Sequence, residues 1–350
     1  MNVFIPHKKD ANIYLDEIMT FSKGNFIFGD YTENDTNFEI INIHFPDAIF
    51  DWKLPNSELL EALELQFQKW KQYAKIVYTL NDFTTHYDKY DEFSVLFKMV
   101  HKYADGVIHL GKYSLDNYSR FFSKNCLHTV IYHPLYDSLT KLNSKDIQAL
   151  IPVDLKDKYI VSVVGNIRSF EEMRLIIKIF KKLPIKNKIL IVPRMLRFVS
   201  LPKYCPYRFR NIYKFLFVRI NTFPLSEKQY YFNDKFLKYP FITDLVKRSS
   251  LMIIPRIRNL NSGNLFLGLT FDKPMIIPAV GNLTEIGNLF KFPLFDLKKN
   301  NLNEVIHYIV NSKKADIFGT EEYISNKKLF HPREIARQYD DFFNLLLNKI

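Results

Sequence analysis

The sequence contains little cysteine and no long apolar run. Only two of its 350 residues are cysteines, Cys126 and Cys205. They lie far apart without the spacing of metal ligands, so we expect two reduced thiols in a cytoplasmic protein. No stretch approaches the roughly 20 apolar residues that cross a bilayer. The N-terminus enters a strand-like run, residues 2–6, without the charged and then apolar pattern of an export signal.

Acidic residues are also scarce relative to basic ones. The chain has 37 of them against 49 lysines and arginines, which gives a net charge of +12 and a pI near 9.3. This excess of positive charge indicates an anionic partner. A nucleic acid, an anionic membrane surface and a diphosphate substrate all satisfy it, so the charge alone does not choose among them.

The pattern along the chain is typical of an α/β fold. Short apolar, β-branched runs alternate with longer segments of helical period, which predicts parallel sheets wound with helices. At 350 residues the chain is too long for one core and suits two such domains. In the first half we expect strands at residues 2–6, 40–45, 75–80, 106–110 and 128–133, and helices at 57–74, 91–104 and 113–122.

A second, similar series follows a polar segment, residues 137–158, that suits an interdomain link. Here we expect strands at 159–164, 188–192, 251–255 and 274–278, and helices at 170–183, 241–248, 262–270, 303–311 and 332–348. The sequence thus predicts a Rossmann-like domain over 1–150, a second over 151–331, and a C-terminal helix over 332–350 that packs back toward the first. Two doubly wound domains of this kind are expected to face each other across a cleft, with ligands at the carboxyl ends of the strands.

The most informative stretch runs from Asn261 to Gly287. Asn261, Ser262, Gly263 and Asn264 open a helix directly after a strand. Free N–H groups and the positive end of the helix dipole form an anion site suited to a diphosphate. A second strand then leads to a loop that carries Gly281 and Glu285, whose carboxylate can accept hydrogen bonds from a ribose. The competing interpretation is ordinary capping of two βα units.

This stretch resembles the donor-binding region of GT-B glycosyltransferases, in which a small-residue helix start, "K/R-P-V-I-x-P" and "G-x-x-x-E" recur. Further motifs of one bacterial subgroup occur in the same order along the chain. These are Ile5-Pro6 with Asn12 and Tyr14, His44-Phe45-Pro46-Asp47, Thr79-Leu80-Asn81-Asp82 with His86, His133-Pro134 with Tyr136, and Gly165-Asn166-Ile167-Arg168. The resemblance implies a GT-B fold and transfer of a sugar from a nucleotide-diphosphate sugar, with no separate cofactor.

Two departures from the family pattern concern the mechanism. Retaining family 4 enzymes carry two glutamates eight positions apart, and these positions here hold Asn259 and Leu267. A lysine usually follows "G-x-I-R", where this chain has Glu171 and Glu172. The resemblance therefore favours inverting enzymes such as bacterial β-glucuronosyl- and β-mannosyltransferases of exopolysaccharide assembly, and leaves open a chain that has lost activity.

Inverting transfer needs a base at the acceptor hydroxyl and positive charge at the leaving diphosphate. By position after strands of the first domain, the candidate bases are His44, Asp47, Asp82 and His86. For the leaving group the best candidate is Arg168, followed by Arg194, Arg256 and Arg258, which all follow strands of the second domain. The donor diphosphate is expected on residues 165–168 and 262–264. No histidine–carboxylate cluster has metal-ligand spacing, so no metal is implied.

The segment between Arg194 and Phe223 carries seven basic residues and no acidic one, interleaved with aromatic residues. Such a segment suits an anionic membrane surface or stacking of single-stranded nucleic acid. An insertion with packed aromatics and solvated charges is the third interpretation. Membrane contact is preferred to nucleic acid because related enzymes often act on lipid-linked acceptors at the cytoplasmic face.

The sequence therefore predicts a glycosyltransferase of surface polysaccharide synthesis that acts on a saccharide or lipid-linked acceptor. We expect it in the cytoplasm, peripherally at the inner face of the cell membrane. One alternative is a nucleotide-sugar 2-epimerase of the same fold. Another is a basic nucleic-acid-binding protein on a glycosyltransferase scaffold.

Overall fold

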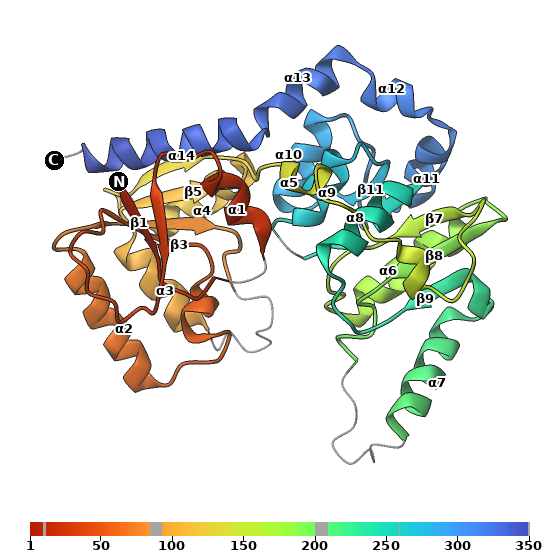
Figure 1. Cartoon of the computed structure of the whole chain (residues 1–350), viewed down its shortest axis with the longest axis horizontal. Helices are drawn as coiled ribbons and strands as arrows, with labels where there is room; N and C mark the ends of the chain where they lie inside the picture. The colour runs from red at the N-terminus through yellow and green to blue at the C-terminus, as the bar shows by residue number, and fades with distance from the viewer. Residues whose placement is uncertain (10–11, 85–92, 200–208, 259, 349–350) are drawn as a thin grey trace. The chain divides into compact units, whose positions relative to one another are not determined.

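The chain forms two compact units, each built on one six-stranded parallel sheet. The structure is a computed structural model that describes residues 1–9, 12–84, 93–199, 209–258 and 260–348. Unit 1 consists of Met1–Tyr136, residues 259–261 and Ser325–Ile350, and unit 2 consists of Asp137–Arg258 and Ser262–Ile324 (Figure 1).

The sheet of unit 1 has the order β2-β1-β3-β4-β5-β6, and all of its neighbouring strands are parallel. Central strands of such a sheet are covered on both faces and therefore consist almost entirely of apolar residues. Their bounds are β1 Asn2–Ile5, β2 Asn25–Phe28, β3 Ile40–Ile43, β4 Lys75–Leu80, β5 Gly106–His109 and β6 Leu127–Val130.

Helices cover both faces of this sheet (Figure 1). Helices α2 (Ser57–Trp70) and α3 (Ser94–Tyr103) pack on one face through a core that includes Phe67, Trp70 and Val100. Helices α1 (Ile13–Met19) and α14 (Pro332–Leu347) pack on the other. Helix α4 (Lys112–Tyr118) and the 3-10 helices η1 (Pro46–Phe50) and η2 (Ser119–Phe121) complete the unit.

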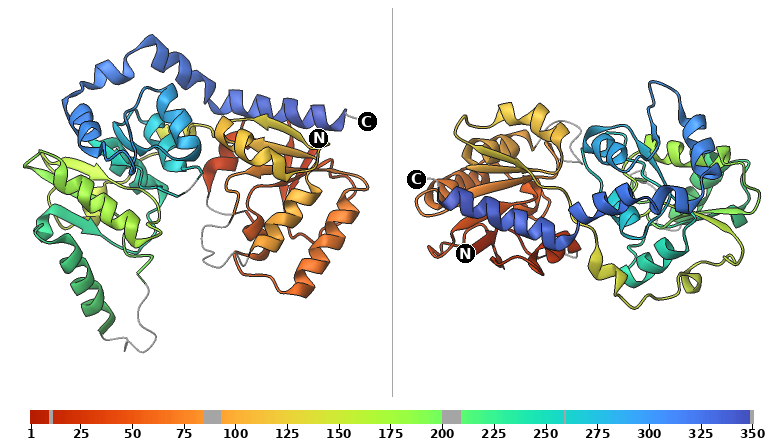
Figure 2. Two further views of the ribbon diagram at one scale, coloured as in Figure 1. Left: turned by 180° about the vertical axis from the view of Figure 1, so that it is seen from behind. Right: turned by 90° about the horizontal axis from the view of Figure 1, so that it is seen from above.

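The C-terminal helix α14 is fixed to unit 1 by polar contacts as well as by its apolar face. The hydroxyl oxygens of Tyr14 and Tyr339 lie 2.7 Å apart in the core. Asp340 accepts hydrogen bonds from the hydroxyl of Ser22 and, at 2.9 Å, from the backbone N–H of Lys23. Residues far apart in sequence thus share one hydrophobic core. Figure 2 shows the ribbon of α14 beside the N-terminal elements from two further directions.

Unit 2 repeats this architecture, with the sheet order β12-β11-β10-β7-β8-β9. Helices α6 and α11 pack on one face of the sheet. The strands are β7 Tyr159–Ser162, β8 Lys188–Val192, β9 Tyr230–Phe232, β10 Leu251–Ile253, β11 Met275–Pro278 and β12 Leu294–Phe295. The helices are α5 Asp137–Thr140, α6 Phe170–Lys182, α7 Arg210–Thr222, α8 Tyr239–Arg248, α9 Gly263–Thr270, α10 Gly281–Leu289, α11 Leu302–Asn311, α12 Lys314–Phe318 and α13 Glu321–Leu329, with 3-10 helices η3 Ile147–Leu150 and η5 Glu227–Gln229.

Each sheet contains one point where the winding direction reverses. In unit 1 the chain runs from β1 outward to β2 and then returns to β3 on the other side of β1. In unit 2 it runs from β7 outward through β8 to β9 and returns to β10 beside β7. Ligands of doubly wound sheets bind outside the carboxyl ends of the strands at such switch points. A ligand is therefore expected at the loops after β1, β3, β7 and β10.

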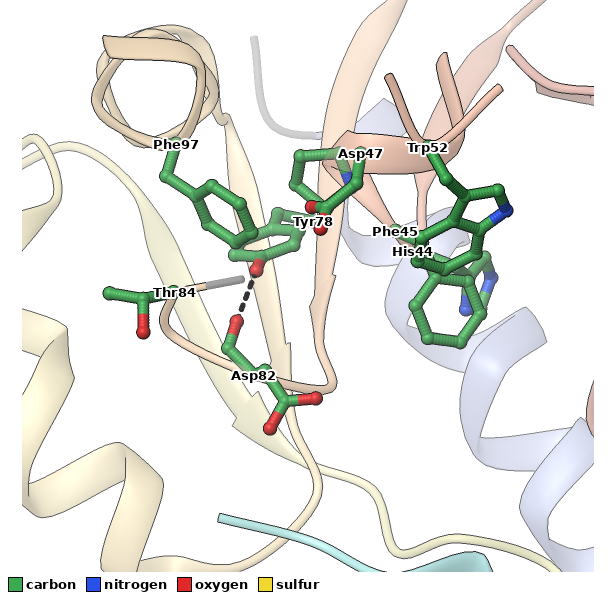
Figure 3. A pocket seen from close by; sticks show the side chains of 9 residues that line it. His44, Phe45, Asp47, Trp52, Tyr78, Asp82, Thr84 and Phe97 are labelled. Atoms are coloured by element: carbon green, nitrogen blue, oxygen red, sulfur yellow. Dashed lines mark hydrogen bonds between the residues drawn. The ribbon is translucent and has the colours of Figure 1, made fainter. Parts of the chain in front are cut away.

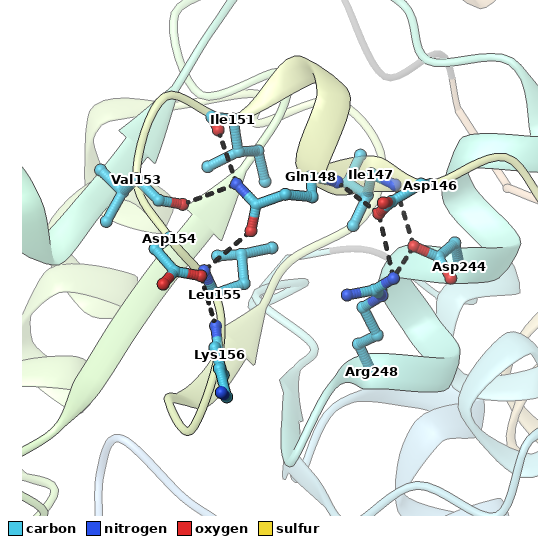
Figure 4. Close-up of polar contacts among 10 residues, drawn as sticks. All are labelled: Asp146, Ile147, Gln148, Ile151, Val153, Asp154, Leu155, Lys156, Asp244 and Arg248. Atoms are coloured by element: carbon cyan, nitrogen blue, oxygen red, sulfur yellow. Dashed lines mark hydrogen bonds and ion pairs between the residues drawn. The ribbon is translucent and has the colours of Figure 1, made fainter.

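The polar segment expected to link the domains belongs to unit 2, where hydrogen bonds hold it in place (Figure 4). The side chain of Gln148 donates to the carbonyls of Ile151 and Val153 and accepts from the N–H of Leu155, at 2.8–3.0 Å. The carboxylate of Asp244 in α8 accepts from the N–H of Ile147 at 2.9 Å. One glutamine thus satisfies three backbone groups of a stretch that has little regular hydrogen bonding of its own.

All nine strands expected from the sequence are confirmed, two with identical bounds and seven with ends shifted by at most three residues. Strands β2, β9 and β12 and helices α1, α5, α7, α10, α12 and α13 were not expected. The placement of Gly281 and Glu285 on a loop was wrong, because both lie in helix α10. The short turn after β11 leaves these residues no room outside the helix.

Candidate active site

A small pocket lies in unit 1 at the carboxyl ends of β3 and β4 (Figure 3). Its volume of about 20 Å³ holds a single water-sized group. Three of the four candidate bases, His44, Asp47 and Asp82, line this pocket together. The fourth, His86, lies outside the described residues. The other lining residues are Phe45, Pro46, Trp52, Tyr78, Thr84 and Phe97.

Local backbone structure places the two aspartates. Asp47 lies in the first turn of η1, which Pro46 begins, and the side chain is buried. Asp82 follows β4 by two residues, and its backbone carbonyl accepts a hydrogen bond of 2.6 Å from the hydroxyl of Tyr78. This bond leaves the Asp82 carboxylate pointing away from Tyr78 (Figure 3). Burial, reinforced by the charges of Asp82 and Asp47, raises the pKa of Tyr78, which therefore remains a hydrogen-bond donor.

His44 is fully buried at the switch point of the sheet. Within the described part of the chain, neither of its ring nitrogens has a hydrogen-bond partner. The Tyr14 ring meets it edge-on, with centroids 5.6 Å apart. Burial, helped by nearby His7, holds the pKa of His44 well below its usual value. His44 is thus a neutral imidazole, suited to exchange a hydrogen bond with a ligand but weak as a proton acceptor.

Sequence reasoning missed the aromatic wall of this pocket. Trp52 is 45% exposed although it is large and apolar, and its ring lies 5.7 Å from that of Phe45. Asp51 and Trp52 both adopt the left-handed backbone conformation, with φ of 52° and 63°. Non-glycine residues adopt it at an energetic cost and are found in this state disproportionately at functional sites. Aspartate is enriched in this conformation but tryptophan is not, so the local sequence does not predict two such residues in succession.

In unit 2, a second cluster surrounds the loop that follows β7. Gly165 has φ of 87°, a conformation that favours glycine. A Cβ atom at this position would lie 3.1 Å from Nδ2 of Asn264 and 3.8 Å from Nη2 of Arg256. The Asn264 side chain in turn donates to the carbonyl of Val164. The loop after β7 and the start of α9 are therefore in direct contact.

A buried ion pair supports this loop. Nη1 of Arg256 lies 2.8 Å from both carboxylate oxygens of Glu172, and Nη2 donates to the carbonyl of Asn166 at 2.6 Å. The Glu172 carboxylate also accepts from the backbone N–H of Arg168 at 2.8 Å. Glu172 thus holds a positive group near Gly165, the guanidinium of Arg256, which follows a different strand. Its charge is already matched by Glu172, which makes Arg256 a support for the loop.

The remaining arginines differ in their surroundings. The backbone carbonyl of Arg194 accepts a bond of 3.4 Å from the N–H of Ile167, and its guanidinium lies 5.3 Å from the ring centre of Phe236. Arg168 lies on the loop itself and is partly exposed. Arg258 is exposed and pairs with Glu171 at 2.7 Å.

Helices α6, α9 and α10 begin at the carboxyl ends of β7, β10 and β11, which are neighbours in the sheet. Ser262 is the N-cap residue of α9. Among the described residues, its side chain makes no capping hydrogen bond. The amides at Gly263 and Asn264 are therefore not occupied by that side chain, as expected of an anion site.

The structure thus brings Gly165, Arg168, Arg256 and Asn264 together. Ser262 and Gly263 precede Asn264 at the start of α9, and the backbone carbonyl of Arg194 is hydrogen-bonded to the loop. Glu285 occupies the fifth position of α10 and is partly exposed. Asn261 belongs to unit 1, where its side chain donates to the carbonyl of Asn81 at 2.6 Å.

Two properties of the described residues bear on other classes of protein. Across that part of the chain, no three or more histidine, cysteine, aspartate or glutamate side chains form a group able to hold a metal ion. Of the helices present there, none is long and apolar enough to cross a membrane.

Comparison with known proteins supports the fold. No protein-family model matches the sequence, and no curated protein matches it. HepE of Anabaena, solved with UDP and glucose, aligns over 98% of this chain and 99% of its own with a TM-score of 0.68 at 12% identity. Sucrose-phosphate synthase of Thermosynechococcus elongatus aligns over 99% and 98% (TM-score 0.67, 13% identity). A glycosyltransferase of Rickettsia africae aligns over 100% and 99% (TM-score 0.61, 11% identity).

The GT-B fold predicted from the sequence is therefore confirmed. The finer resemblance, to family 4-like or to glucuronosyl- and mannosyltransferase-like enzymes, stays a prediction.

Proposed function

We propose that the chain is a glycosyltransferase that moves a sugar from a nucleotide-diphosphate sugar to a saccharide or lipid-linked acceptor in surface polysaccharide synthesis. The observation that carries the proposal is the contact between the Gly165 loop and the start of α9 at the switch point of the second sheet. Backbone N–H groups at a helix start and a glycine that admits close approach are what a diphosphate requires.

In this proposal the donor binds to unit 2. The diphosphate lies against the Gly165 loop and the amides of Gly263 and Asn264, with Glu285 near the ribose. Arg168 stabilises the charge that develops on the leaving diphosphate, because its loop position is held by Glu172. Structures of HepE with UDP and with UDP-glucose support UDP as the first nucleotide to test.

The acceptor belongs to the pocket of unit 1. Its hydroxyl oxygen forms a bond to the anomeric carbon while the bond from that carbon to the diphosphate breaks. A base takes the hydroxyl proton, and Asp82 is favoured because its carboxylate is partly exposed and directed away from Tyr78. The exposed ring of Trp52 offers an apolar surface for the C–H face of a sugar ring.

Single displacement with inversion is the simplest chemistry for this set of residues. Leu267, at one of the two glutamate positions of the retaining pattern, is buried in α9 and carries no ionisable group. The proposed localisation is cytoplasmic, at the inner face of the cell membrane when the acceptor is lipid-linked. The proposal includes no cofactor besides the donor.

A thermal-shift screen with UDP, GDP, ADP and their sugars tests the donor part, since a ligand of the native state raises the apparent stability. We expect one nucleoside diphosphate to raise the Tm in a concentration-dependent manner. The sugar donor of that nucleotide should remain unchanged when it is incubated with the protein alone. When an acceptor is added, the donor should release the nucleoside diphosphate. Epimerised donor in the acceptor-free reaction would favour the epimerase, and no response to any nucleotide would overturn the proposal.

A further inference from the structure

Helix α7 projects from the rest of unit 2 (Figure 1), and a stripe of large apolar residues along it is exposed. Ile220 is 75% exposed and Phe223, directly after the helix, is 71% exposed, which is unusual for large apolar residues. The exposed stripe consists of Phe209, Ile212, Tyr213, Leu216, Ile220 and Phe223. Apart from the adjacent Ile212 and Tyr213, successive members are three or four residues apart and therefore share one side of the helix.

The opposite side of α7 attaches the helix to unit 2. Thr222 is fully buried, and the ring of Phe217 lies 6.1 Å from that of Phe170 and 6.4 Å from that of Phe198. Lys214 forms a salt bridge of 2.5 Å with Asp234. The helix is therefore fixed by a side with mixed polarity, and its most apolar side remains open to an external partner.

Charge identifies that partner. The segment from Arg194 to Phe223, which includes α7, carries seven basic residues and no acidic one. A second copy of the chain, meeting the same surface about a twofold axis, would bring these positive charges together without a counter-charge in the segment. A nucleic acid would match the charge, but three of the six stripe residues, Ile212, Leu216 and Ile220, are aliphatic and interrupt the aromatic surface that bases need for stacking.

We propose that α7 and its flanking residues Phe209 and Phe223 form a membrane-docking helix that lies in the interface of an anionic lipid bilayer. Its apolar stripe enters the boundary between headgroups and acyl chains, and Arg219, which is exposed on the same helix, meets the lipid phosphates. A helix of 13 residues spans about 20 Å, which suits it to lie in the plane of the membrane. No residue of this surface belongs to the proposed nucleotide or acceptor site, and the docking proposal does not depend on the proposed reaction.

The test is co-sedimentation of the full chain with vesicles of pure phosphatidylcholine or with about one third phosphatidylglycerol. The variant Leu216→Ser/Ile220→Ser removes two residues of the stripe. The matched control, Leu65→Ser/Leu345→Ser, removes two leucines that are 59% and 57% exposed on α2 and α14. Thermal unfolding confirms that both variants are folded, as expected of changes at exposed side chains.

We expect the wild type and the control to bind anionic vesicles, and the stripe variant to bind at least tenfold more weakly. Raising the salt concentration should weaken wild-type binding, because charges at an exposed surface are screened. Equal recovery of wild type with neutral and anionic vesicles, or equal binding of stripe variant and control, would overturn the proposal. A lipid-free dimer that the stripe variant abolishes, or oligonucleotide binding lost in that variant, would assign the surface to a protein or nucleic acid instead.

Discussion

Arg256 and Glu172 form a buried ion pair in which one guanidinium nitrogen lies 2.8 Å from both carboxylate oxygens. The pair joins the end of β10 to the first turn of α6, and the same carboxylate accepts the backbone N–H of Arg168. Two loops at the switch point of the second sheet are thereby held together. The proposed diphosphate site depends on this connection, since it sets the loop that carries Gly165 and Arg168.

The first prediction is that Glu172→Gln destabilises the protein by about 3–5 kcal/mol, because the charge of Arg256 would remain buried without its partner. The measurement is the free energy of unfolding by urea. Glu171→Gln is the matched control, since Glu171 pairs with Arg258 at the surface, where both side chains are more than half exposed. Its expected cost is about 0–1 kcal/mol. Similar costs for the two variants would contradict the role assigned to the buried pair.

The second prediction concerns the diphosphate site. Gly263→Val places a branched side chain at the start of α9, where the proposed anion approaches the backbone. We expect at least a tenfold loss of nucleoside diphosphate affinity in calorimetry, about 1.4 kcal/mol, with the protein still folded. Gly165→Ala should weaken binding as well, because its backbone φ of 87° strains any side chain. Unchanged affinity in Gly263→Val would remove the helix start from the site.

Sequence reasoning located the strands well, for reasons that the three missed strands make clear. Central strands such as β4 and β8 are buried on both faces and consist of uninterrupted apolar residues, which a sequence pattern detects. The missed strands β2, β9 and β12 all lie at sheet edges. Edge strands pair on one side only and are shorter and less buried, so their pattern merges with that of loops.

The sequence predicted where the site residues lie in the fold, but not which side chains contact each other. His44, Asp47 and Asp82 follow strands, and the carboxyl ends of parallel strands meet at one edge, so their proximity follows from the fold. The pairing of Glu172 with Arg256 joins residues 84 positions apart through side-chain geometry, which no local pattern encodes. The two consecutive left-handed residues that expose Trp52 are likewise a consequence of the surrounding packing.

The third prediction is that stability falls steeply below neutral pH because of buried histidines. Burial lowers the pKa of His101 to about 4 and the pKa values of His109 and His133 to about 3. The unfolded chain binds these protons near pH 6.5, whereas the folded chain does not. Above about pH 6.5 the free energy of unfolding is not reduced by these histidines. As the pH falls from there toward 4 and then 3, it decreases by up to about 1.4 kcal/mol per pH unit for each histidine.

Urea unfolding at pH 7, 6 and 5 measures this slope. His109→Gln should flatten it by the share of one histidine, whatever its effect on absolute stability. A slope that is unchanged in this variant would assign the pH dependence to other groups.

The last prediction concerns the base. Among Asp47→Asn, Asp82→Asn, His44→Ala and His86→Ala, we expect Asp82→Asn to abolish transfer, with a loss of roughly 100- to 10,000-fold in kcat. His44 is a neutral, fully buried imidazole, and Asp47 is also buried, so both are better suited to hold the acceptor than to take its proton. Nucleotide affinity should survive in every variant, because the proposed donor site consists of unit 2 residues. Asp116→Asn, at an exposed aspartate of α4 paired with Lys112, is the control and should retain full turnover. If all four site variants retain near-normal turnover, the base lies elsewhere, and a retaining mechanism must then be tested by determining the anomeric configuration of the product.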